Sequence, residues 1–360
     1  MRTLNSITIR GYKSIRELDR LILSQLNILI GANGAGKSNF ISLFKLLNQL
    51  VSKRLQVFVA QSGGANSLMH HGRKATNEIQ INLGFADNGY EVKLEPTVND
   101  NLIISDEQCR YFNPIGKRYN IHLGRGTKET TLDEAAKTKP IAEYVFNDLS
   151  DWKVYHFHDT SDGASVKRTG DINDNAILRP DAENLAAFLY LLKTNHQAHY
   201  ERIVDTIRLA APFFDDFILR PRPDNPNKIR LEWSELGVDT YLDASSLSDG
   251  TLRFICLATL LLQPNLPTVV LIDEPELGLH PSAIVLLTEM LRSAAVRSQV
   301  IVSTQSVPLV NQVSPEDVIV VEREDNQSVF RRLNFLDLEE WLEEYSLGEL
   351  WEKNVLGGRP

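Results

Sequence analysis

The N-terminal region combines two strand-like patterns with a helical one, and a glycine-rich segment separates them. Ser6–Arg10 alternates apolar and polar residues, which predicts a β-strand. Leu26–Ile30 is an apolar run that predicts a second strand, ending at Gly31. Apolar residues then recur at helical spacing in Asn39–Leu47. The glycines therefore lie between a predicted strand and a predicted helix.

The middle of the chain changes from strand-like to helical patterns. Between Asn77 and Leu123, short alternating segments with polar turns predict antiparallel strands, and Trp152–Phe157 predicts a further strand. Ser161–Asp174 is polar and contains glycine, which predicts a loop. Asp181–Phe214 has apolar residues at helical spacing, which predicts helices.

The last third alternates between helical and strand-like segments. Thr251–Leu262 and Pro281–Ala295 predict helices, and Val269–Ile272 and Gln299–Ser303 predict buried strands. This alternation favours a parallel sheet with helices on its faces. A short strand is also expected at Ile229–Trp233, and an acidic amphipathic helix, a potential docking face for a partner, at Glu339–Tyr345.

Gly31–Ser38 (Gly-Ala-Asn-Gly-Ala-Gly-Lys-Ser) has the spacing of a P-loop, which cradles nucleotide phosphates. The glycines let backbone N–H groups turn toward the phosphates, and the following helix adds the positive end of its dipole. Lys37 is expected to neutralise the β- and γ-phosphates, and Ser38 to ligate Mg²⁺. The expected contacts to ATP are Asn33, Gly34, Ala35, Gly36, Lys37, Ser38 and Asn39.

Two carboxylates follow the apolar strand Val269–Ile272. Asp273 is placed to hold Mg²⁺, usually through water, and Glu274 is placed to polarise the attacking water in phosphoryl transfer. The alternative is a strand that ends in a solvated acidic turn. Together with the P-loop, this pair predicts ATP hydrolysis that depends on Mg²⁺.

Ser246–Thr251 (Ser-Leu-Ser-Asp-Gly-Thr) precedes the predicted helix and resembles the signature motif of ABC ATPases, in the form used by the SMC/RecF-like branch. A serine and a glycine at a helix N-terminus offer a hydroxyl and N–H groups to an anion. The alternative is a plain helix cap, in which Ser248 or Asp249 serves the helix alone.

The segment Asp273–Pro281 (Asp-Glu-Pro-Glu-Leu-Gly-Leu-His-Pro) resembles a group of predicted prokaryotic AAA/RecF-like ATPases. The group includes the ATPase halves of overcoming-lysogenisation-type proteins and of several phage-defence operons. Gly11–Ile15 is similar to its nucleotide-edge loop, which places Lys13 and Ser14 beside the nucleotide, and Leu347–Trp351 is similar to its ending. The resemblance covers essentially the whole chain.

The resemblance implies an α/β fold, a P-loop NTPase of ABC type. It should have a mixed β-sheet nucleotide-binding lobe, an antiparallel β subdomain and a helical lobe. Residues 1–160 would form the N-terminal part of the ATPase lobe, and residues 161–250 the helical lobe with the signature motif. Residues 251–360 would form the C-terminal part with the acidic strand end, the switch and a tail.

The resemblance further implies that two chains pair head to tail around ATP. The P-loop of one chain then faces the signature of the other, so that Ser248 and Gly250 contact the γ-phosphate in trans. Because the chain has one P-loop and one signature, two complete sites require a homodimer.

Three positions depart from the pattern of ABC ATPases. Many members carry a switch histidine where this chain has Gln305, a candidate catalytic residue that can form hydrogen bonds but cannot take a proton. The D-loop position, usually an aspartate, falls near Leu279 and His280. His158, with Asp159, is the proposed Q-loop residue and a candidate nucleotide contact. Because His156 and His158 would share one face of a strand, core packing and a metal site are the alternatives.

Composition limits the partners and the location. The chain has 360 residues and a net charge of −9, so any nucleic-acid contact would come from a local patch. Its two cysteines, Cys109 and Cys256, form no CxxC pair, which argues against a disulfide framework and a cysteine-rich zinc site and favours a reducing cytoplasm. The longest apolar runs, near Phe254–Leu262 and Val269–Ile272, are too short to cross a bilayer, and no signal core precedes them, so no membrane partner is expected.

Complete nucleotide motifs without an effector domain predict a switch. ATP would close the homodimer, and the closed state would control a separate effector protein, plausibly in anti-phage defence. The segment after Ser306 is too short for the nuclease domain of overcoming-lysogenisation-type proteins. The alternative function is a RecF-like, ATP-dependent DNA-binding protein in repair or recombination. A transporter ATPase subunit and a self-contained nuclease are less favoured.

Overall fold

The computed structural model describes residues 3–112 and 118–359 and divides the chain into two units. The first unit comprises residues 1–154, 267–271 and 314–360, and the second comprises residues 155–266 and 272–313. Each unit is built around its own buried apolar residues. The P-loop lies in the first unit, and the acidic strand end and the signature motif lie in the second.

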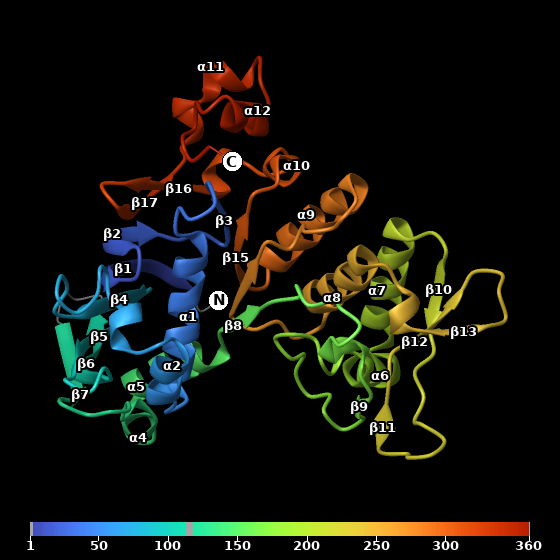
Figure 1. Cartoon of the computed structure of the whole chain (residues 1–360), viewed down its shortest axis with the longest axis horizontal. Helices are drawn as coiled ribbons and strands as arrows, with labels where there is room; N and C mark the ends of the chain where they lie inside the picture. Colours follow the sequence, from blue (N-terminus) through green and yellow to red (C-terminus); the bar gives the residue numbers. More distant parts are fainter. Residues whose placement is uncertain (1–2, 113–117, 360) are drawn as a thin grey trace. The chain divides into compact units, whose positions relative to one another are not determined.

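The first unit contains a six-stranded antiparallel sheet with the order β2-β1-β4-β5-β6-β7 (Figure 1). Its strands are β1 (Leu4–Tyr12), β2 (Ile15–Ile22), β4 (Ile79–Phe85), β5 (Asn88–Pro96), β6 (Leu102–Phe112) and β7 (Arg118–Gly124). The antiparallel strands predicted between Asn77 and Leu123 are therefore confirmed. The burial of β4 alternates along its length, as expected for a strand with one covered face.

The other six-stranded sheet has the order β17-β16-β3-β15-β14-β8. Its strands are β3 (Leu26–Ile30), β8 (Lys153–Tyr155), β14 (Val269–Asp273), β15 (Gln299–Thr304), β16 (Val318–Glu324) and β17 (Gln327–Arg332). β16 runs parallel to β3, but β17 returns antiparallel to β16 as a hairpin. The predicted mixed sheet is confirmed. The chain turns back between β16 and β17 through Asp325 and Asn326, which both have positive φ.

The helices of the first unit begin with α1, directly after the P-loop. They are α1 (Lys37–Val51), α2 (Leu55–Gln61), α3 (Ala65–Leu68), α4 (Leu132–Ala136), α5 (Pro140–Asp151), α11 (Glu339–Leu342) and α12 (Leu347–Glu352). α1 turns its apolar residues inward, where Phe44 contacts Trp152 with ring centroids 5.3 Å apart. Trp152 also contacts Phe85 of β4, which joins α1 to the antiparallel sheet. Packing of this kind supplies most of a helix's stability in a folded protein.

The acidic helix expected at Glu339–Tyr345 is shorter than predicted. α11 ends at Leu342 and buries none of its residues, so little apolar contact extends it. The chain then turns, and Ser346 opens α12 through a capping box with Glu349. α12 is held by Trp351, which is fully buried and donates its indole N–H to the Gly358 carbonyl at 2.5 Å.

The second unit is mainly helical (Figure 1). Its helices are α6 (Leu185–Asn195), α7 (Gln197–Ala210), α8 (Asp249–Leu262), α9 (Pro281–Ala295) and α10 (Val307–Val310). The residues Leu252–Leu262 of α8 are all buried, so this helix is the centre of the unit. The helices predicted at Asp181–Phe214, Thr251–Leu262 and Pro281–Ala295 are confirmed.

Short strands complete the second unit. They are β9 (Gly170–Asp171), β10 (Phe214–Phe217), β11 (Lys228–Ile229), β12 (Glu232–Glu235) and β13 (Tyr241–Asp243). β10, β12 and β13 form one antiparallel sheet, and β11 pairs with β9 in another. The single strand expected at Ile229–Trp233 is therefore wrong, because its two ends pair with different neighbours. The loop expected at Ser161–Asp174 contains β9 and a turn of 3₁₀ helix at Ser165–Lys167.

The strand expected at Trp152–Phe157 is also shorter. β8 ends at Tyr155, and the His156 N–H donates to the Pro180 carbonyl at 2.9 Å instead of to a neighbouring strand. The idea that His156 and His158 share a strand face is therefore wrong. Both lie on the segment after β8, which belongs to no helix or strand.

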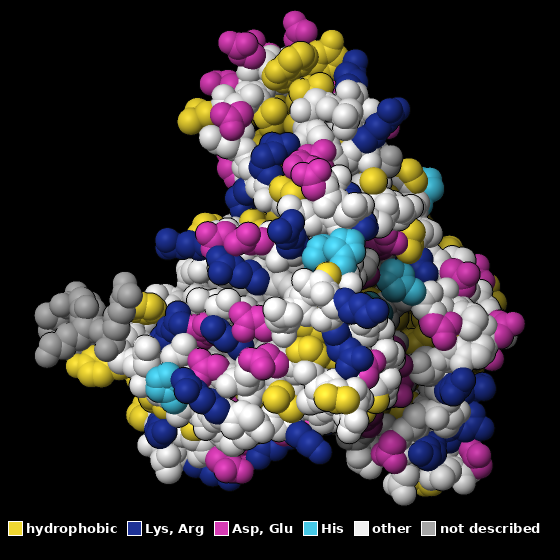
Figure 2. Space-filling model, turned by 60° about the vertical axis from the view of Figure 1, so that its left-hand side comes forward, with side chains coloured by type: hydrophobic (Ala, Val, Ile, Leu, Met, Phe, Trp, Pro, Cys, Tyr) yellow, Lys and Arg dark blue, Asp and Glu magenta, His cyan; other side chains and the backbone are white. Residues whose placement is uncertain are grey.

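The surface mixes charges of both signs. In the face shown in Figure 2, Lys and Arg side chains lie among Asp and Glu side chains. Within the described ranges, no helix combines the length and apolar character needed to cross a bilayer.

Candidate nucleotide site

The P-loop connects β3 to α1 through two glycines that no other residue could replace without strain. Gly31 and Gly36 have φ of 151° and 122°, a region that L side chains rarely adopt. A Cβ on Gly31 would overlap the Val321 carbonyl oxygen, and one on Gly36 would overlap the Ser328 hydroxyl. The backbone of the loop therefore lies directly against the β16–β17 hairpin.

The start of α1 is suited to an anion. Among the described residues, no side chain caps this helix, so its first N–H groups are not satisfied by a capping oxygen. The Lys37 ammonium is buried and donates to the carbonyls of Gly31 at 2.5 Å and Ala32 at 3.2 Å, which folds it over the loop. Ser38, Asn33 and Gly34 are exposed at the rim, whereas Ala35 is buried beneath. These residues fit nucleotide phosphates and a Mg²⁺ ion at the loop's open side.

The nucleotide-edge loop is connected to α1 by hydroxyl groups. Lys13 has φ of 46° and donates from Nζ to Ser42 at 3.0 Å. Burial lowers the pKa of Lys13, and the nearby Lys45 lowers it further. Ser14 accepts a hydrogen bond from the Asn39 amide at 2.8 Å. Asn39 therefore positions Ser14, in addition to any contact with the nucleotide that the sequence predicts.

Ser328 of β17 is a site residue that the sequence motifs miss. Its hydroxyl lies 2.7 Å from the Ser14 hydroxyl and 2.5 Å from the Ala35 carbonyl oxygen, and its N–H donates to the Ser14 carbonyl at 2.7 Å. It is fully buried. One hydroxyl thus connects the hairpin, the nucleotide-edge loop and the P-loop. No local signal marks Ser328, because Ser14 is 314 residues away in sequence.

In the second unit, the two expected carboxylates are Asp273, the last residue of β14, and Glu274, which follows it. Asp273 accepts a hydrogen bond from the Ser303 hydroxyl of β15. Glu274 has φ of 43°, which costs a residue with a side chain about 1–3 kcal/mol. Its N–H donates to the Ser303 carbonyl at 2.9 Å, and its carboxylate accepts from the side-chain amide of Gln305. The predicted catalytic pair Glu274 and Gln305 is therefore in direct contact.

Glu276 is a second residue that the motifs miss. It is buried and accepts from the Thr304 hydroxyl at 2.5 Å and from the Gln305 N–H at 3.1 Å. Burial raises the pKa of this carboxyl, whereas the hydrogen bond from Thr304 lowers it. Glu276 therefore fixes the backbone from which the Gln305 side chain extends toward Glu274.

The signature motif opens α8. Ser248 is the N-cap and accepts from the Thr251 N–H at 3.2 Å, as the capping interpretation expects, while Asp249 is the first residue of the helix. Ser248 is exposed. A Cβ on Gly250 would overlap the Gly278 carbonyl oxygen. Close packing therefore requires a glycine at position 250, independently of the predicted phosphate contact. His280, near the expected D-loop, caps α9 through Ser282.

Arg253 is the third residue that the motifs miss, although a lone arginine in the apolar run of α8 is a visible signal. It is buried, and its guanidinium donates from Nε to the Phe157 carbonyl at 2.9 Å and from Nη2 to the His158 carbonyl at 3.2 Å. Nη1 donates to the Leu277 carbonyl. Burial lowers its pKa. Arg253 thus joins the signature helix to the His158 segment and to the turn after Glu274.

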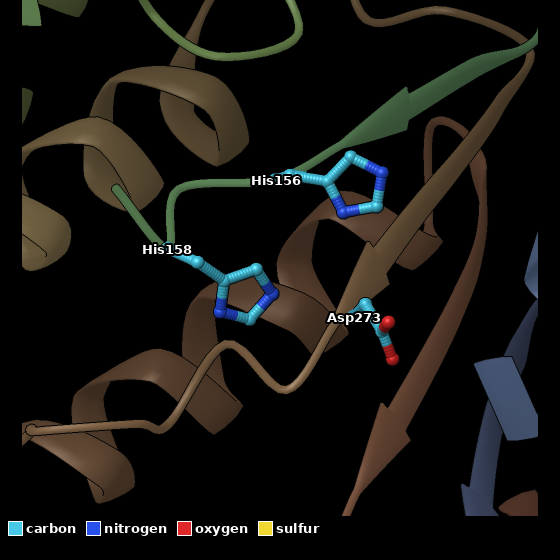
Figure 3. Close-up of side chains that lie close together, drawn as sticks. All are labelled: His156, His158 and Asp273. Atoms are coloured by element: carbon cyan, nitrogen blue, oxygen red, sulfur yellow. The ribbon is translucent and has the colours of Figure 1, made fainter. Parts of the chain in front are cut away.

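His158 lies beside the acidic strand end. His158, His156 and Asp273 each offer one ligand atom, and these atoms all lie within 4.8 Å of one another (Figure 3). Asp159 instead turns to Ser161, accepting from its N–H at 3.1 Å and its hydroxyl at 2.7 Å. These hydrogen bonds lower the pKa of Asp159. Of the two Q-loop candidates, only His158 is placed beside Asp273.

Known proteins share both sequence and fold with this chain. Residues 26–311 match the family model described as "AAA domain, putative AbiEii toxin, Type IV TA system". Over 113 residues, the chain is 35% identical to a "Putative ABC transporter ATP-binding protein" of Methanosarcina acetivorans, a match that covers 29% of this chain. The chain spans only 40% of the length of that curated relative.

Two solved structures have a similar fold. One is the SmcHead bound to the C-winged helix domain of ScpA, with a TM-score of 0.55, 16% identity, and coverage of 94% of this chain and 99% of that one. The other is the Smc head domain with an extended coiled coil, bound to the C-terminal domain of ScpA, from Pyrococcus furiosus. Its TM-score is 0.56 at 15% identity, and it covers 96% of this chain and 99% of that one.

The P-loop precedes α1, Asp273 ends β14 and is followed by Glu274, and the signature precedes and opens α8. The matched family region contains all three. The chain therefore belongs to the family described as "AAA domain, putative AbiEii toxin, Type IV TA system", and its fold is similar to that of Smc head domains.

Proposed function

We propose that the chain hydrolyses ATP with the help of Mg²⁺ and that Glu274 and Gln305 orient the attacking water. The hydrogen bond between these two side chains carries the proposal, because it holds a carboxylate in one orientation at the end of the strand that also presents Asp273. A fixed acceptor for a water proton is what a phosphoryl-transfer site needs beyond positioning and charge.

Each of the other residues has a role that its geometry supports. The N–H groups of Asn33–Gly36 and the start of α1 bind phosphate oxygens, and Lys37 neutralises them. Ser38 and Asp273 hold Mg²⁺, which neutralises phosphate charge when bound. Lys13 and Ser14 form the nucleotide edge, where Asn39 holds the Ser14 hydroxyl. His158 takes the Q-loop role.

We further propose that the active form is a head-to-tail homodimer. Ser248 and Gly250 of one chain then complete the site that the P-loop of the partner begins. The exposure of Ser248 at the N-terminus of α8 supports this role, because a hydroxyl at a helix start suits an anion.

A mixing experiment tests the dimer. Lys37→Ala inactivates the P-loop of its own chain, and Ser248→Arg blocks the signature that its chain lends to the partner. Each variant alone should lose most of its ATPase activity. Mixed in equal amounts, they should recover activity, because a mixed dimer has one site with wild-type residues on both sides. A mixture as inactive as its components would contradict a shared site.

A matched control is available three residues upstream. Ser245 is exposed like Ser248, and its N–H donates to the Asp243 carboxylate. Ser245→Arg adds the same charge and bulk outside the signature motif and should retain full activity. If Ser245→Arg were as inactive as Ser248→Arg, added bulk would explain the loss without any role for the signature.

We propose that the closed dimer controls a separate effector, in anti-phage defence. The family description, which names a toxin and a Type IV TA system, supports this role, and so do Smc heads solved in complex with ScpA. Co-purification of the Glu274→Gln variant, with and without ATP, should capture an effector only with ATP. Equal capture in both conditions would contradict control by the closed state.

The alternative is a RecF-like DNA-binding ATPase. Its fold would be the same, but the net charge of −9 and the mixed charges of Figure 2 favour the switch. DNA binding that requires ATP and weakens steeply with salt would favour the alternative, because phosphate contacts release counterions.

A further inference from the structure

Two histidines and an aspartate converge in the second unit. His156 and His158 come from the segment after β8, and Asp273 ends β14 (Figure 3). One ligand atom from each lies within 4.8 Å of the others. The two imidazole rings have centroids 6.1 Å apart and are tilted by 33°. In the part of the chain that the structure describes, this is the one such group of histidine, cysteine and acidic residues.

The donor set selects a class of ion. Mg²⁺ prefers oxygen ligands, whereas two imidazole nitrogens and one carboxylate oxygen suit Zn²⁺ and its neighbours such as Co²⁺. Metal–ligand bonds of about 2 Å allow ligand atoms up to about 4 Å apart. His158 is exposed, so small rotations of its side chain can bring its nitrogen within that range.

We propose that His156, His158 and Asp273 bind a divalent ion of the Zn²⁺ and Co²⁺ type, and that they do so without nucleotide. Three protein ligands leave the remaining coordination positions to water. The proposal does not rest on the ATPase function, because neither Lys37 nor Ser38 is a ligand. It gives Asp273 a second use, since the same carboxylate is the proposed Mg²⁺ ligand when nucleotide is bound.

The backbone on either side of the ligands is already held. Arg253 binds the carbonyls of Phe157 and His158, and Pro180 accepts the N–H of His156. Ser303 donates its hydroxyl to Asp273. Groups that orient metal ligands in this way contribute strongly to affinity, because the ligands lose less freedom when the ion binds.

The test uses the full chain, freed of metal and nucleotide. Zn²⁺ is titrated by calorimetry, and Co²⁺ is followed by its visible absorption. We expect one ion per chain. Removal of a single orienting group typically lowers the metal affinity of a site by about 10- to 100-fold, so Ser303→Ala should lower the Zn²⁺ affinity by about that factor. His158→Asn and His156→Asn each remove a ligand and should lower the Zn²⁺ affinity by a larger factor.

The chain offers matched controls for both alternatives. His196 and His199 form another histidine pair, with ring centroids 6.3 Å apart, so His196→Asn tests adventitious binding to surface histidines. Lys37→Ala tests binding at the P-loop. Both variants should bind Zn²⁺ like the wild type. Because His158 is exposed, His158→Asn should fold normally, which circular dichroism and the melting temperature would check.

Several outcomes would overturn the proposal. They are the absence of Zn²⁺ binding by the wild type, unchanged binding by His158→Asn, and lost binding by His196→Asn or Lys37→Ala. The ATPase proposal fails separately: if Zn²⁺ binds as described while the wild-type chain fails to hydrolyse MgATP, the metal site stands and the ATPase function does not.

Discussion

The side-chain amide of Gln305 donates a hydrogen bond to the carboxylate of Glu274. The contact joins the turn after β15 to the turn after β14, where the backbone of Glu274 is held in the left-handed region. An amide in this position can orient the carboxylate at any pH, because it does not titrate. A histidine there would make the same contact depend on its protonation.

The replacement Gln305→His should therefore change the pH profile. Imidazole titrates at about pH 6.5, so kcat/KM of the variant should change with pH in this region, whereas kcat/KM of the wild type should not. Gln305→Ala should lower kcat by up to about 100-fold, the lower end of a general-base contribution, because Glu274 itself remains, and it should leave KM for ATP nearly unchanged. Steady-state kinetics from about pH 5.5 to 8.5 would check both variants. Identical profiles for the wild type and Gln305→His would contradict the contact's role.

Ser328→Ala should weaken the P-loop without touching its motif. The variant loses the hydroxyl that bridges Ser14 and the Ala35 carbonyl, in a fully buried position. We expect a loss of about 1–3 kcal/mol in unfolding free energy, measured by urea denaturation, because buried partners are left unsatisfied. KM for ATP should rise. Ser161→Ala, at an exposed hydroxyl in the second unit, is the control and should leave KM unchanged.

Gly250→Ala should separate packing from phosphate binding. The new Cβ would overlap the Gly278 carbonyl oxygen, so the turn after Glu274 must shift, at about 1–3 kcal/mol in unfolding free energy. Ser248→Ala should cost only about 1 kcal/mol, the worth of a helix cap. Chemical denaturation of both variants measures the difference. Equal stability of Gly250→Ala and the wild type would contradict the close approach.

Glu276 should make stability depend on pH. Burial raises its folded pKa above the ordinary value of 4.5, so the folded state keeps its proton to higher pH than the unfolded state. The unfolding free energy therefore falls as pH rises from about 4.5 through the raised pKa, and is constant above it. The difference in unfolding free energy between the wild type and Glu276→Gln should fall over this window. A difference that rises with pH would show that the folded pKa is lowered instead.

The sequence predicted those parts of the site that depend on neighbours in the chain. The P-loop, the acidic strand end and the start of α8 each combine a motif with the strand or helix that carries it, and these contacts are local. The contacts of Glu276, Arg253 and Ser328 could not be predicted, because their partners lie 24 to 314 residues away. Only the fold decides which carbonyls and hydroxyls they meet.

The shorter strand β8 shows the same limit. The apolar pattern continues through Phe157, so the sequence favours a strand that carries both histidines on one face. The strand ends earlier because His156 finds its hydrogen-bond partner in Pro180, which belongs to a distant loop. The apolar pattern of a sequence predicts which residues are buried. Whether a segment joins a sheet depends on the partners of its backbone hydrogen bonds.

The three acceptors of Arg253 are all main-chain carbonyls, at Phe157, His158 and Leu277. Every amino acid has the same main-chain carbonyl, so the hydrogen bond from Arg253 does not depend on which side chain stands at position 158. The imidazole at position 158 can be replaced by an amide or a carboxylate while the backbone that Arg253 binds stays in place. Because of Arg253, the side chain at position 158 can be substituted, by evolution or by design, without loss of these hydrogen bonds.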